Sequence, residues 1–490
     1  MTPIPFDNSY AKLPEAFFSR LAPTPVAAPR MIRTNNSLAE ELGIDPQWLA
    51  SSQAAEVVAG NLVPPGADPI ATVYAGHQFG SYNPQLGDGR AILLGEVVRE
   101  DGQRFDVQLK GAGRTPYSRG GDGRSPLGPV VREYLISEAM HALGVPTTRA
   151  LAAACTGETV VREDMLPGAV LARVASSHIR IGTFQFFAAR GDTEALQTLL
   201  QHAAARHYPG TLEQDNCALA FLQTVISRQA QLVARWQLLG FIHGVMNTDN
   251  MLVSGETVDY GPCAFMDAFN PEQVFSSIDH AGRYAYRNQP GIAHWNLACL
   301  AQALIPLLHE DKDQAVAMAQ TVVDTFPGQF LDAHTKGMAR KLGLEDINDD
   351  DTALVEDLFQ LMADERVDFT LMFRHLSDVA NNNQTETAVA GVFDMPEPLA
   401  PWLQSWRERA ARGAGKQAAL AARMYRANPA FIPRNHRVEE AILAANSGDF
   451  EPFNTLADLL QTPHDYQPEW SRYATPPEPS EVVHQTFCGT

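Results

Sequence analysis

Short stretches in which apolar and polar residues alternate dominate residues 74–177. Ala91–Val98 and Phe105–Lys110 flank a short turn and predict an antiparallel pair of strands. The helical spacing of apolar residues in Pro129–Leu143 predicts one helix. Three more strands are expected after it, the first two joined by a turn at Thr156-Gly157-Glu158: Ala150–Ala154, Thr159–Arg162 and Ala169–Ala175. The pattern predicts a small unit of strands with one helix.

Beyond His178 the apolar spacing becomes mainly helical. Phe221–Gly240 predicts a long amphipathic helix. The apolar run Trp295–Leu308 is broken by polar residues and falls short of the roughly 20 residues that span a bilayer, so it predicts a core helix. Met251–Val253 and Val258–Tyr260 surround a turn and predict a hairpin.

The last part of the chain combines helical patterns with proline-rich sequence. From about Asn348 onward the apolar spacing is helical again. Pro463–Pro479 is rich in proline and predicts an extended tail. No internal repeat stands out.

The composition narrows the class of protein. The chain has 490 residues, of which 45% are apolar and 19% charged, and its formal net charge is −20. Phosphate recognition along a nucleic acid needs a surplus of Lys and Arg on one face, so we expect no nucleic-acid partner. The N-terminus shows neither an export signal nor an Arg-rich presequence. We therefore expect a cytoplasmic protein without a membrane partner.

The segment from His243 to Leu252, followed by Asp259-Tyr260-Gly261, has the spacing of a kinase catalytic loop and its metal-binding Asp. Asn250 and Asp259 occupy the two metal positions, and their oxygens suit Mg²⁺. Val245 stands where a kinase has the Asp that accepts the substrate proton. The pattern predicts either an inactive kinase or a kinase-shaped protein with different nucleotide chemistry.

This order of elements predicts an α+β protein with a bilobal, protein-kinase-like fold. We expect an N-terminal extension at residues 1–73 and a kinase-like N-lobe at 74–177. A C-lobe that carries the catalytic loop is expected at 178–345, followed by a C-terminal helical region and tail at 346–490.

Lys110 and Glu133 fall in the order of the kinase ion pair that holds phosphate. Lys110 ends a predicted strand, and Glu133 lies on the helix that follows it. The alternative is a solvated Lys at a strand end and an ordinary Glu on a helix. Burial of the pair would decide between the two.

Two glycine-rich loops and three arginines are candidates for phosphate contacts. Gln85–Arg90 and Arg119–Arg124 let backbone N–H groups approach a phosphate, although each could be only a tight turn. Arg90, Arg173 and Arg180 could together hold a polyphosphate through planar, multi-donor contacts, or each could form a surface ion pair.

Asp249 is the nearest carboxylate that can replace the base missing at Val245. It directly precedes Asn250, and a base must lie within hydrogen-bond reach of the attacking hydroxyl. The alternative role for Asp249 is support of the metal site.

The chain resembles the selenoprotein O family, the YdiU-type protein adenylyltransferases, over nearly its whole length. The resemblance rests on five segments: Tyr74–Gly80, Gln85–Arg90, Gln108–Gly113, His243–Met251 and Ile432–Glu439. It implies a kinase-like fold in which ATP lies turned round relative to kinases. AMP would then pass from ATP to Ser, Thr or Tyr hydroxyls of proteins, and pyrophosphate would leave.

The resemblance also implies roles for particular residues. Asp249 would be the catalytic base, Asn250 and Asp259 the ligands of Mg²⁺ or Mn²⁺, and Glu133 the partner of Lys110. The expected ATP contacts are Gly87, Gly89, Arg90, Lys110, Asp122, Gly123, Arg173 and Arg180. A triphosphate whose γ end enters the protein needs cationic partners, which would account for the arginines.

Two other functions stay open, namely γ-phosphoryl transfer and nucleotide binding without catalysis. Val245 counts against the first, and the intact metal pair with Lys110 and Glu133 counts against the second. Family members end in a selenocysteine or cysteine, and Cys488 has that place. Some bacterial relatives can pair it with a cysteine in the activation segment. Because Val274–Asp279 contains none, we expect no such redox switch.

Overall fold

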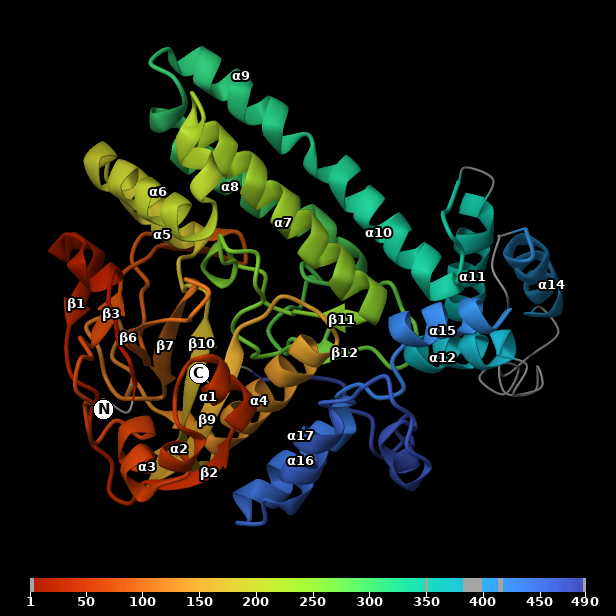
Figure 1. Ribbon diagram of the computed structural model, residues 1–490, viewed down its shortest axis with the longest axis horizontal. Helices are drawn as coiled ribbons and strands as arrows, with labels where there is room; N and C mark the ends of the chain where they lie inside the picture. The colour runs from red at the N-terminus through yellow and green to blue at the C-terminus, as the bar shows by residue number, and fades with distance from the viewer. Residues whose placement is uncertain (1–3, 349–350, 382–398, 413–416, 488–490) are drawn as a thin grey trace.

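The computed structural model describes residues 4–348, 351–381, 399–412 and 417–487, so Cys488 lies outside the described residues. Within the described part, the first third of the chain builds one antiparallel sheet (Figure 1). Its strands follow in the order β1 (Phe18–Arg20), β3 (Ile70–Thr72), β6 (Ala91–Val98), β7 (Arg104–Lys110), β10 (Met165–Ala175), β9 (Arg149–Val161) and β2 (Arg30–Thr34), with β8 (Ser125–Pro126) also paired to β10.

The predicted strand pair β6 and β7 is confirmed, whereas the prediction for β9 is wrong. The segments expected as two strands form one strand, Arg149–Val161, and the chain turns back only after it. Its two edges pair with β2 and β10, which keeps the backbone extended. The register against β10 shifts at Thr156-Gly157-Glu158, where Gly157 has a φ of 71°. The sequence signal for a turn therefore marks a β-bulge.

The first 73 residues supply both edge strands of the sheet and part of its core. Their helices are α1 (Asn36–Glu41), α2 (Pro46–Leu49) and α3 (Ser52–Val58). Leu38 and Val57 from these helices pack in one apolar cluster with Val107 and Val170 of the sheet. The predicted boundary at residue 74 does not interrupt the sheet, and the division of the chain into those ranges stays a prediction.

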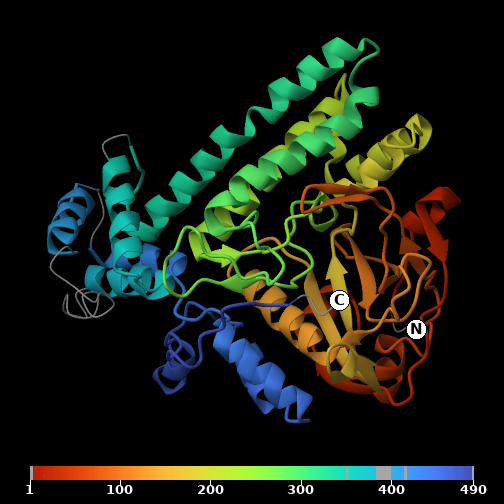
Figure 2. The same ribbon diagram turned by 180° about the vertical axis from the view of Figure 1, so that it is seen from behind.

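A helical layer follows the sheet along the chain. The helices are α5 (Ile181–Ala188), α6 (Thr193–His207), α7 (Cys217–Leu239), α8 (Gln289–Leu308), α9 (Lys312–Val323) and α10 (Phe326–Leu342). Figures 1 and 2 show α9 and α10 following each other in one long run beside α7 and α8. The predicted helix Phe221–Gly240 is confirmed as α7: Asn216 caps its first turn, and Gly240 ends it in the left-handed conformation.

Helix α8 is longer than the sequence pattern predicts. By length and composition alone, Tyr286–Leu308 could cross a membrane, with a mean hydropathy of 1.4. Half of that apolar window is buried inside the protein, where α8 packs against α5, α7 and α9. A core helix of a globular protein passes the same test, so this single helix is weak evidence for a membrane segment.

The hairpin expected at Met251–Val253 and Val258–Tyr260 is not formed. The two arms hydrogen-bond to different parts of the chain instead: the Val253 amide donates to the Ile179 carbonyl, and the Thr257 amide donates to the Pro146 carbonyl. The short strand pair beside this loop is β11 (Phe241–Ile242) with β12 (Ala264–Phe265).

The C-terminal part of the chain is helical, as predicted. It contains α11 (Thr352–Asp364), α12 (Phe369–Ala380), α14 (Leu399–Ala410), α15 (Gln417–Ala427), α16 (Asn435–Asn446) and α17 (Glu451–Leu459). Helices α16 and α17 return to the sheet and pack on α4 (Leu127–Ala142), the helix predicted at Pro129–Leu143 (Figure 1). The proline-rich tail is only partly extended, since Pro468–Tyr473 forms a short 3₁₀ helix.

Candidate functional site

A cavity of about 720 Å³ opens between one end of the sheet and the loops that carry Asn250 and Asp259. It brings together eleven of the twelve residues predicted for the site: Gly87, Gly89, Arg90, Lys110, Asp122, Gly123, Arg173, Arg180, Asp249, Asn250 and Asp259. The twelfth, Glu133 on α4, lies behind Lys110 and is buried. The sheet, α4 and the loops after α7 therefore meet at one place, although their residues are far apart in sequence.

Three cations converge on the Asp259 carboxylate. Its Oδ1 accepts hydrogen bonds from Lys110 Nζ at 3.1 Å and from Arg173 Nη1 at 2.6 Å. Its Oδ2 accepts from Arg180 Nη1 at 2.6 Å. The Asp259 side chain is 22% exposed, whereas the three cations are nearly buried. Buried charges in such a cluster stay ionised only if they are paired.

Glu133 completes this cluster from α4. Its carboxylate accepts from both Lys110 and Arg173. Burial by itself would raise the pKa of Glu133, but the charges of Lys110 and Arg173 hold that pKa below its usual range. Burial acts in the same way on Asp259, whose pKa is held well below its usual range by Arg173, Lys110 and Arg180. The buried pairing excludes the alternative of a solvated Lys110.

Asn250 and Asp259 offer an amide and a carboxylate oxygen to a cation. The Asn250 Nδ2 donates to the Val245 carbonyl at 2.9 Å, which leaves Oδ1 as the oxygen available for a ligand. No group of three or more His, Cys, Asp or Glu in the described part of the chain could hold a metal by itself. Mg²⁺ commonly takes one or two protein oxygens and completes its shell with water and phosphate oxygens. The two residues fit a cation that arrives with a nucleotide.

Asp249 lies in the 3₁₀ turn Thr248–Asn250 and is buried at the edge of the cavity. Burial raises the pKa of its carboxyl to about 6, against the opposing charge of Arg180. Gly76 makes room for it, because a β-carbon there would lie 2.4 Å from Asp249 Oδ1. The valine at position 245 also lines the cavity and cannot take up a proton.

The glycine-rich loop before β6 packs closely against the loop after β7, which carries Tyr117. Gly87 has a φ of 119°, and a β-carbon there would lie 2.5 Å from the ring of Tyr117. A β-carbon on Gly89 would meet the Tyr117 carbonyl at 2.9 Å. In the second loop, Arg162 grips both oxygens of Asp122, at 2.9 and 3.0 Å. Both loops thus have structural reasons for their sequence beside a phosphate role.

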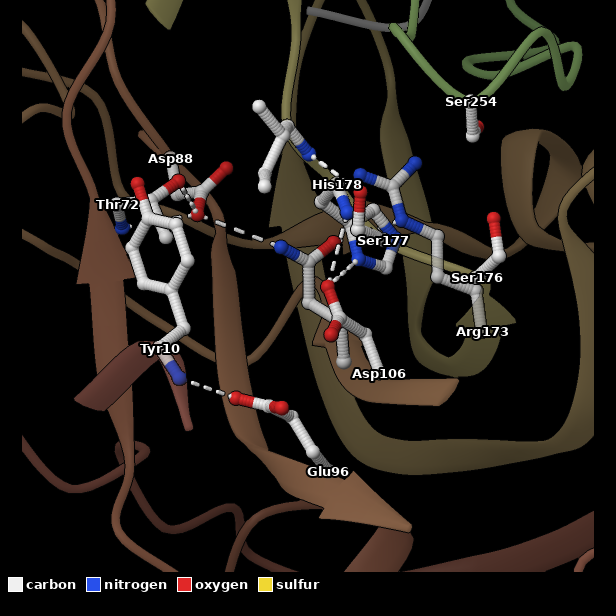
Figure 3. Close-up of polar contacts among 12 residues, drawn as sticks. Tyr10, Thr72, Asp88, Glu96, Asp106, Arg173, Ser176, Ser177, His178 and Ser254 are labelled. Carbon is white, nitrogen blue, oxygen red and sulfur yellow. Dashed lines mark hydrogen bonds and ion pairs between the residues drawn. The ribbon is translucent and has the colours of Figure 1, made fainter. Parts of the chain in front are cut away.

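A buried polar layer lies behind the cavity. Asp88 accepts from Thr72 (Figure 3). Asp88 also accepts from Gln108 at 3.3 Å, and the Gln108 Oε1 in turn accepts from Arg173 Nε at 2.7 Å. This chain of hydrogen bonds runs from the glycine-rich loop to the cation cluster. It fixes the guanidinium plane of Arg173, because the Nε side is already engaged.

A second buried network holds the segment that leads to Arg180. Asp106 accepts from both the backbone N–H and the Nδ1 of His178, at 2.8 and 2.9 Å (Figure 3). Arg206 of α6 donates to Asp106 at 2.6 Å and to Glu96 at 3.0 Å. Burial would raise the pKa of Asp106, but Arg206 and His178 keep it well below its usual range.

Sequence reasoning missed several residues of the cavity wall. Tyr74 lies under Arg180, whose guanidinium carbon is 4.8 Å from the ring centre. Tyr117, Gln78, Phe79 and Asn247 also line the cavity. Tyr74, Gln78 and Phe79 stood inside a segment that the resemblance used, so that segment was the available signal. Nothing in the local sequence around Tyr117 points to the cavity.

The cavity therefore holds a cluster of cations, the side-chain oxygens of Asn250 and Asp259 and a buried carboxylate, a set that suits an enzyme acting on a nucleoside polyphosphate. The family model described as protein adenylyltransferase SelO matches residues 1–461. Proteins called protein nucleotidyltransferase YdiU are 59% identical in Rhodopseudomonas palustris (strain BisB5) and 59% identical in a strain of Methylorubrum extorquens, with 99% of each chain covered. The chain is thus a nucleotidyltransferase. It belongs to the SelO family.

Proposed function

We propose that this chain transfers AMP from ATP to Ser, Thr or Tyr hydroxyls of proteins and releases pyrophosphate. The observation that carries the proposal is the cation cluster of Lys110, Arg173 and Arg180 around Asp259, in a cavity that is also lined by the buried Asp249 and by Val245. The names of the family and its relatives support nucleotidyl rather than phosphoryl transfer.

In the proposed reaction, Asp249 accepts the proton of the protein hydroxyl. The hydroxyl oxygen then forms a bond to the α-phosphorus, and the bond from the α-phosphorus to the oxygen bridging to the β-phosphate breaks, so that pyrophosphate leaves. Lys110, Arg173 and Arg180 bind the phosphates and offset the charge that develops on the leaving group. A divalent cation held by Asn250 and Asp259 supplies further charge neutralisation when it is bound.

The proposal includes a kinase-like arrangement of two lobes with the nucleotide turned round. The order of the sheet, α4, the loop after α7 and Asp259 supports the kinase-like part. The deep position of the cations supports the turned nucleotide, because Arg173 and Arg180 are almost wholly buried and can meet only a phosphate that enters the protein. The contacts of Gly87, Gly89, Arg90, Asp122 and Gly123 with ATP remain part of this proposal.

The experiment is incubation of the chain with Mg²⁺ and ATP labelled at either the α- or the γ-phosphate, with an extract of bacterial proteins as acceptors. We expect protein label from the α-phosphate only, and loss of that label in Asp259→Ala and Asp249→Asn variants. Label from the γ-phosphate alone would show phosphoryl transfer. Absence of label from both would favour a nucleotide-binding scaffold. Replacing Mg²⁺ by Mn²⁺ in the same assay compares the two cations.

A further inference from the structure

A small hairpin outside the main sheet covers the loop that carries Asp249. Its strands are β4 (Gly76–Gln78) and β5 (Ser81–Asn83), which pair with each other in a separate sheet. Phe79 and Gly80 form a two-residue turn with φ values of 51° and 85°, as the twist of a tight hairpin requires. The hairpin has a fixed shape of its own and packs against the turn Thr248–Asn250.

The hairpin bonds three consecutive residues of that loop. The backbone N–H of His77 donates to Thr248 Oγ1 at 2.7 Å, and that of Phe79 donates to Asn247 Oδ1 at 3.0 Å. Gln78 Nε2 donates to Asp249 Oδ2 at 3.3 Å. The first two contacts use backbone donors, so they depend on the course of the hairpin. The third depends on a single side chain.

The hairpin also determines where the Asp249 carboxylate lies. Oδ2 accepts from Gln78, the one side-chain donor to this carboxylate among the residues that the structure describes. Oδ1 has no hydrogen-bond partner in the described part of the chain and occupies the space that a side chain on Gly76 would fill. Gln78 and Asp249 both line the cavity, so their contact lies at its wall.

We infer that Gln78 is a positioning residue, which holds Asp249 in the orientation from which it takes a proton from the acceptor; this inference rests on the proposed function. The hairpin provides the frame, Gly76 provides the space, and the amide of Gln78 selects the orientation of the carboxylate. The two carboxylates of the site are thus held differently: one side-chain amide donates to Asp249, whereas three cations donate to Asp259.

The test compares Gln78→Leu and Gln78→Glu with a Ser81→Ala control in the labelling assay. Glu has the size of Gln but replaces the N–H donor by a charged acceptor, whereas Leu removes the donor without adding charge, so a fall in both variants points to the lost N–H donor. Ser81 pairs with Gln78 in the hairpin backbone, but its side chain is exposed. We expect kcat to fall at least tenfold in both Gln78 variants, with the KM for ATP within twofold of the original and Ser81→Ala unchanged. Retention of kcat within twofold in Gln78→Glu would overturn the inference.

Two outcomes of the labelling assay distinguish a failure of this inference from a failure of the proposed function. If label comes from the γ-phosphate, AMP transfer is wrong, and the same fall in kcat still tests Gln78. If no label is transferred at all, urea unfolding of Gln78→Leu, Asp249→Ala and the double variant decides. A shift in midpoint for the double variant that is smaller than the sum of the single shifts supports the contact, and additive shifts overturn it.

Discussion

Replacing Asp259 by alanine should separate nucleotide binding from chemistry. In the structure, the Asp259 carboxylate accepts hydrogen bonds from Lys110, Arg173 and Arg180. A phosphate that bonds to the same donors would lie about 5 Å from this carboxylate, the length of two hydrogen bonds. At an effective dielectric constant of about 20, two like charges at that distance repel each other by about 3 kcal/mol. Removal of the carboxylate should therefore strengthen ATP binding without metal by at least about tenfold, since tenfold needs only about 1.4 kcal/mol.

The same variant should fail in the presence of Mg²⁺. It lacks one of the two proposed oxygen ligands, so we expect its AMP transfer to fall at least about a hundredfold. The assay is calorimetric titration with ATP in EDTA and in Mg²⁺, together with the labelling assay. Asp458→Ala is a matched control, because Asp458 also bonds an arginine, Arg33, but lies on the surface away from the cavity. Unchanged or weaker ATP binding of Asp259→Ala in EDTA would refute the reasoning.

Three other substitutions test the buried charges and the polar layer. Burial lowers the pKa of Lys341 from 10.5 to about 7. Between these values the unfolded chain binds one more proton than the folded chain, so the free energy of unfolding rises with pH. Lys341→Met lacks this rise, so the advantage of the variant over the original chain in unfolding free energy should shrink by about 3 kcal/mol between pH 7 and about pH 9.5. An advantage that stays constant with pH would contradict this. Arg434→Met leaves Asp267 and Asp368 without their shared cation. The free energy of unfolding, measured with urea, should fall by about 3–5 kcal/mol. A fall of less than about 1 kcal/mol would show that the ion pairs of Arg434 do not contribute to folding. Gln108→Leu removes the oxygen that accepts from Arg173 Nε. We expect the free energy of unfolding to fall by about 1–3 kcal/mol and the KM for ATP to rise. If neither changes, the polar layer does not hold Arg173 in place.

The sequence predicted those parts of the fold whose signal is local. The strands β6 and β7 and the helix α7 carry long, regular patterns with end signals, and all three are confirmed. The segment around Ser254 also looked local, but its two arms bond to Ile179 and Pro146, so distant partners decided its course. The return of α16 and α17 to α4 depends equally on contacts between segments that are far apart in the sequence.

The candidate site was predictable because its residues stand at fixed spacings in short motifs. The spacing placed Asn250 and Asp259, and the order of elements placed Lys110 and Glu133, which the structure brings into one cluster. Tyr117 could not be predicted, because its place against the glycine-rich loop arises only when the antiparallel pairing of β6 with β7 brings the loop before β6 and the loop after β7 together. The roles of all these residues stay predictions until the labelling assay is done.

The residues that line the cavity and the whole chain carry opposite net charge, and we expect this difference to favour short polyanions over long ones. Seven basic and four acidic residues line the cavity in the described structure, whereas the whole chain has a net charge of −20. At physiological ionic strength charges act over about 8 Å, so a ligand short enough to sit inside feels mainly the basic wall. A long polyanion would leave part of its length outside the cavity, where the net charge of the chain repels it, so we expect mononucleotides to bind in preference to polymers that end in the same phosphates.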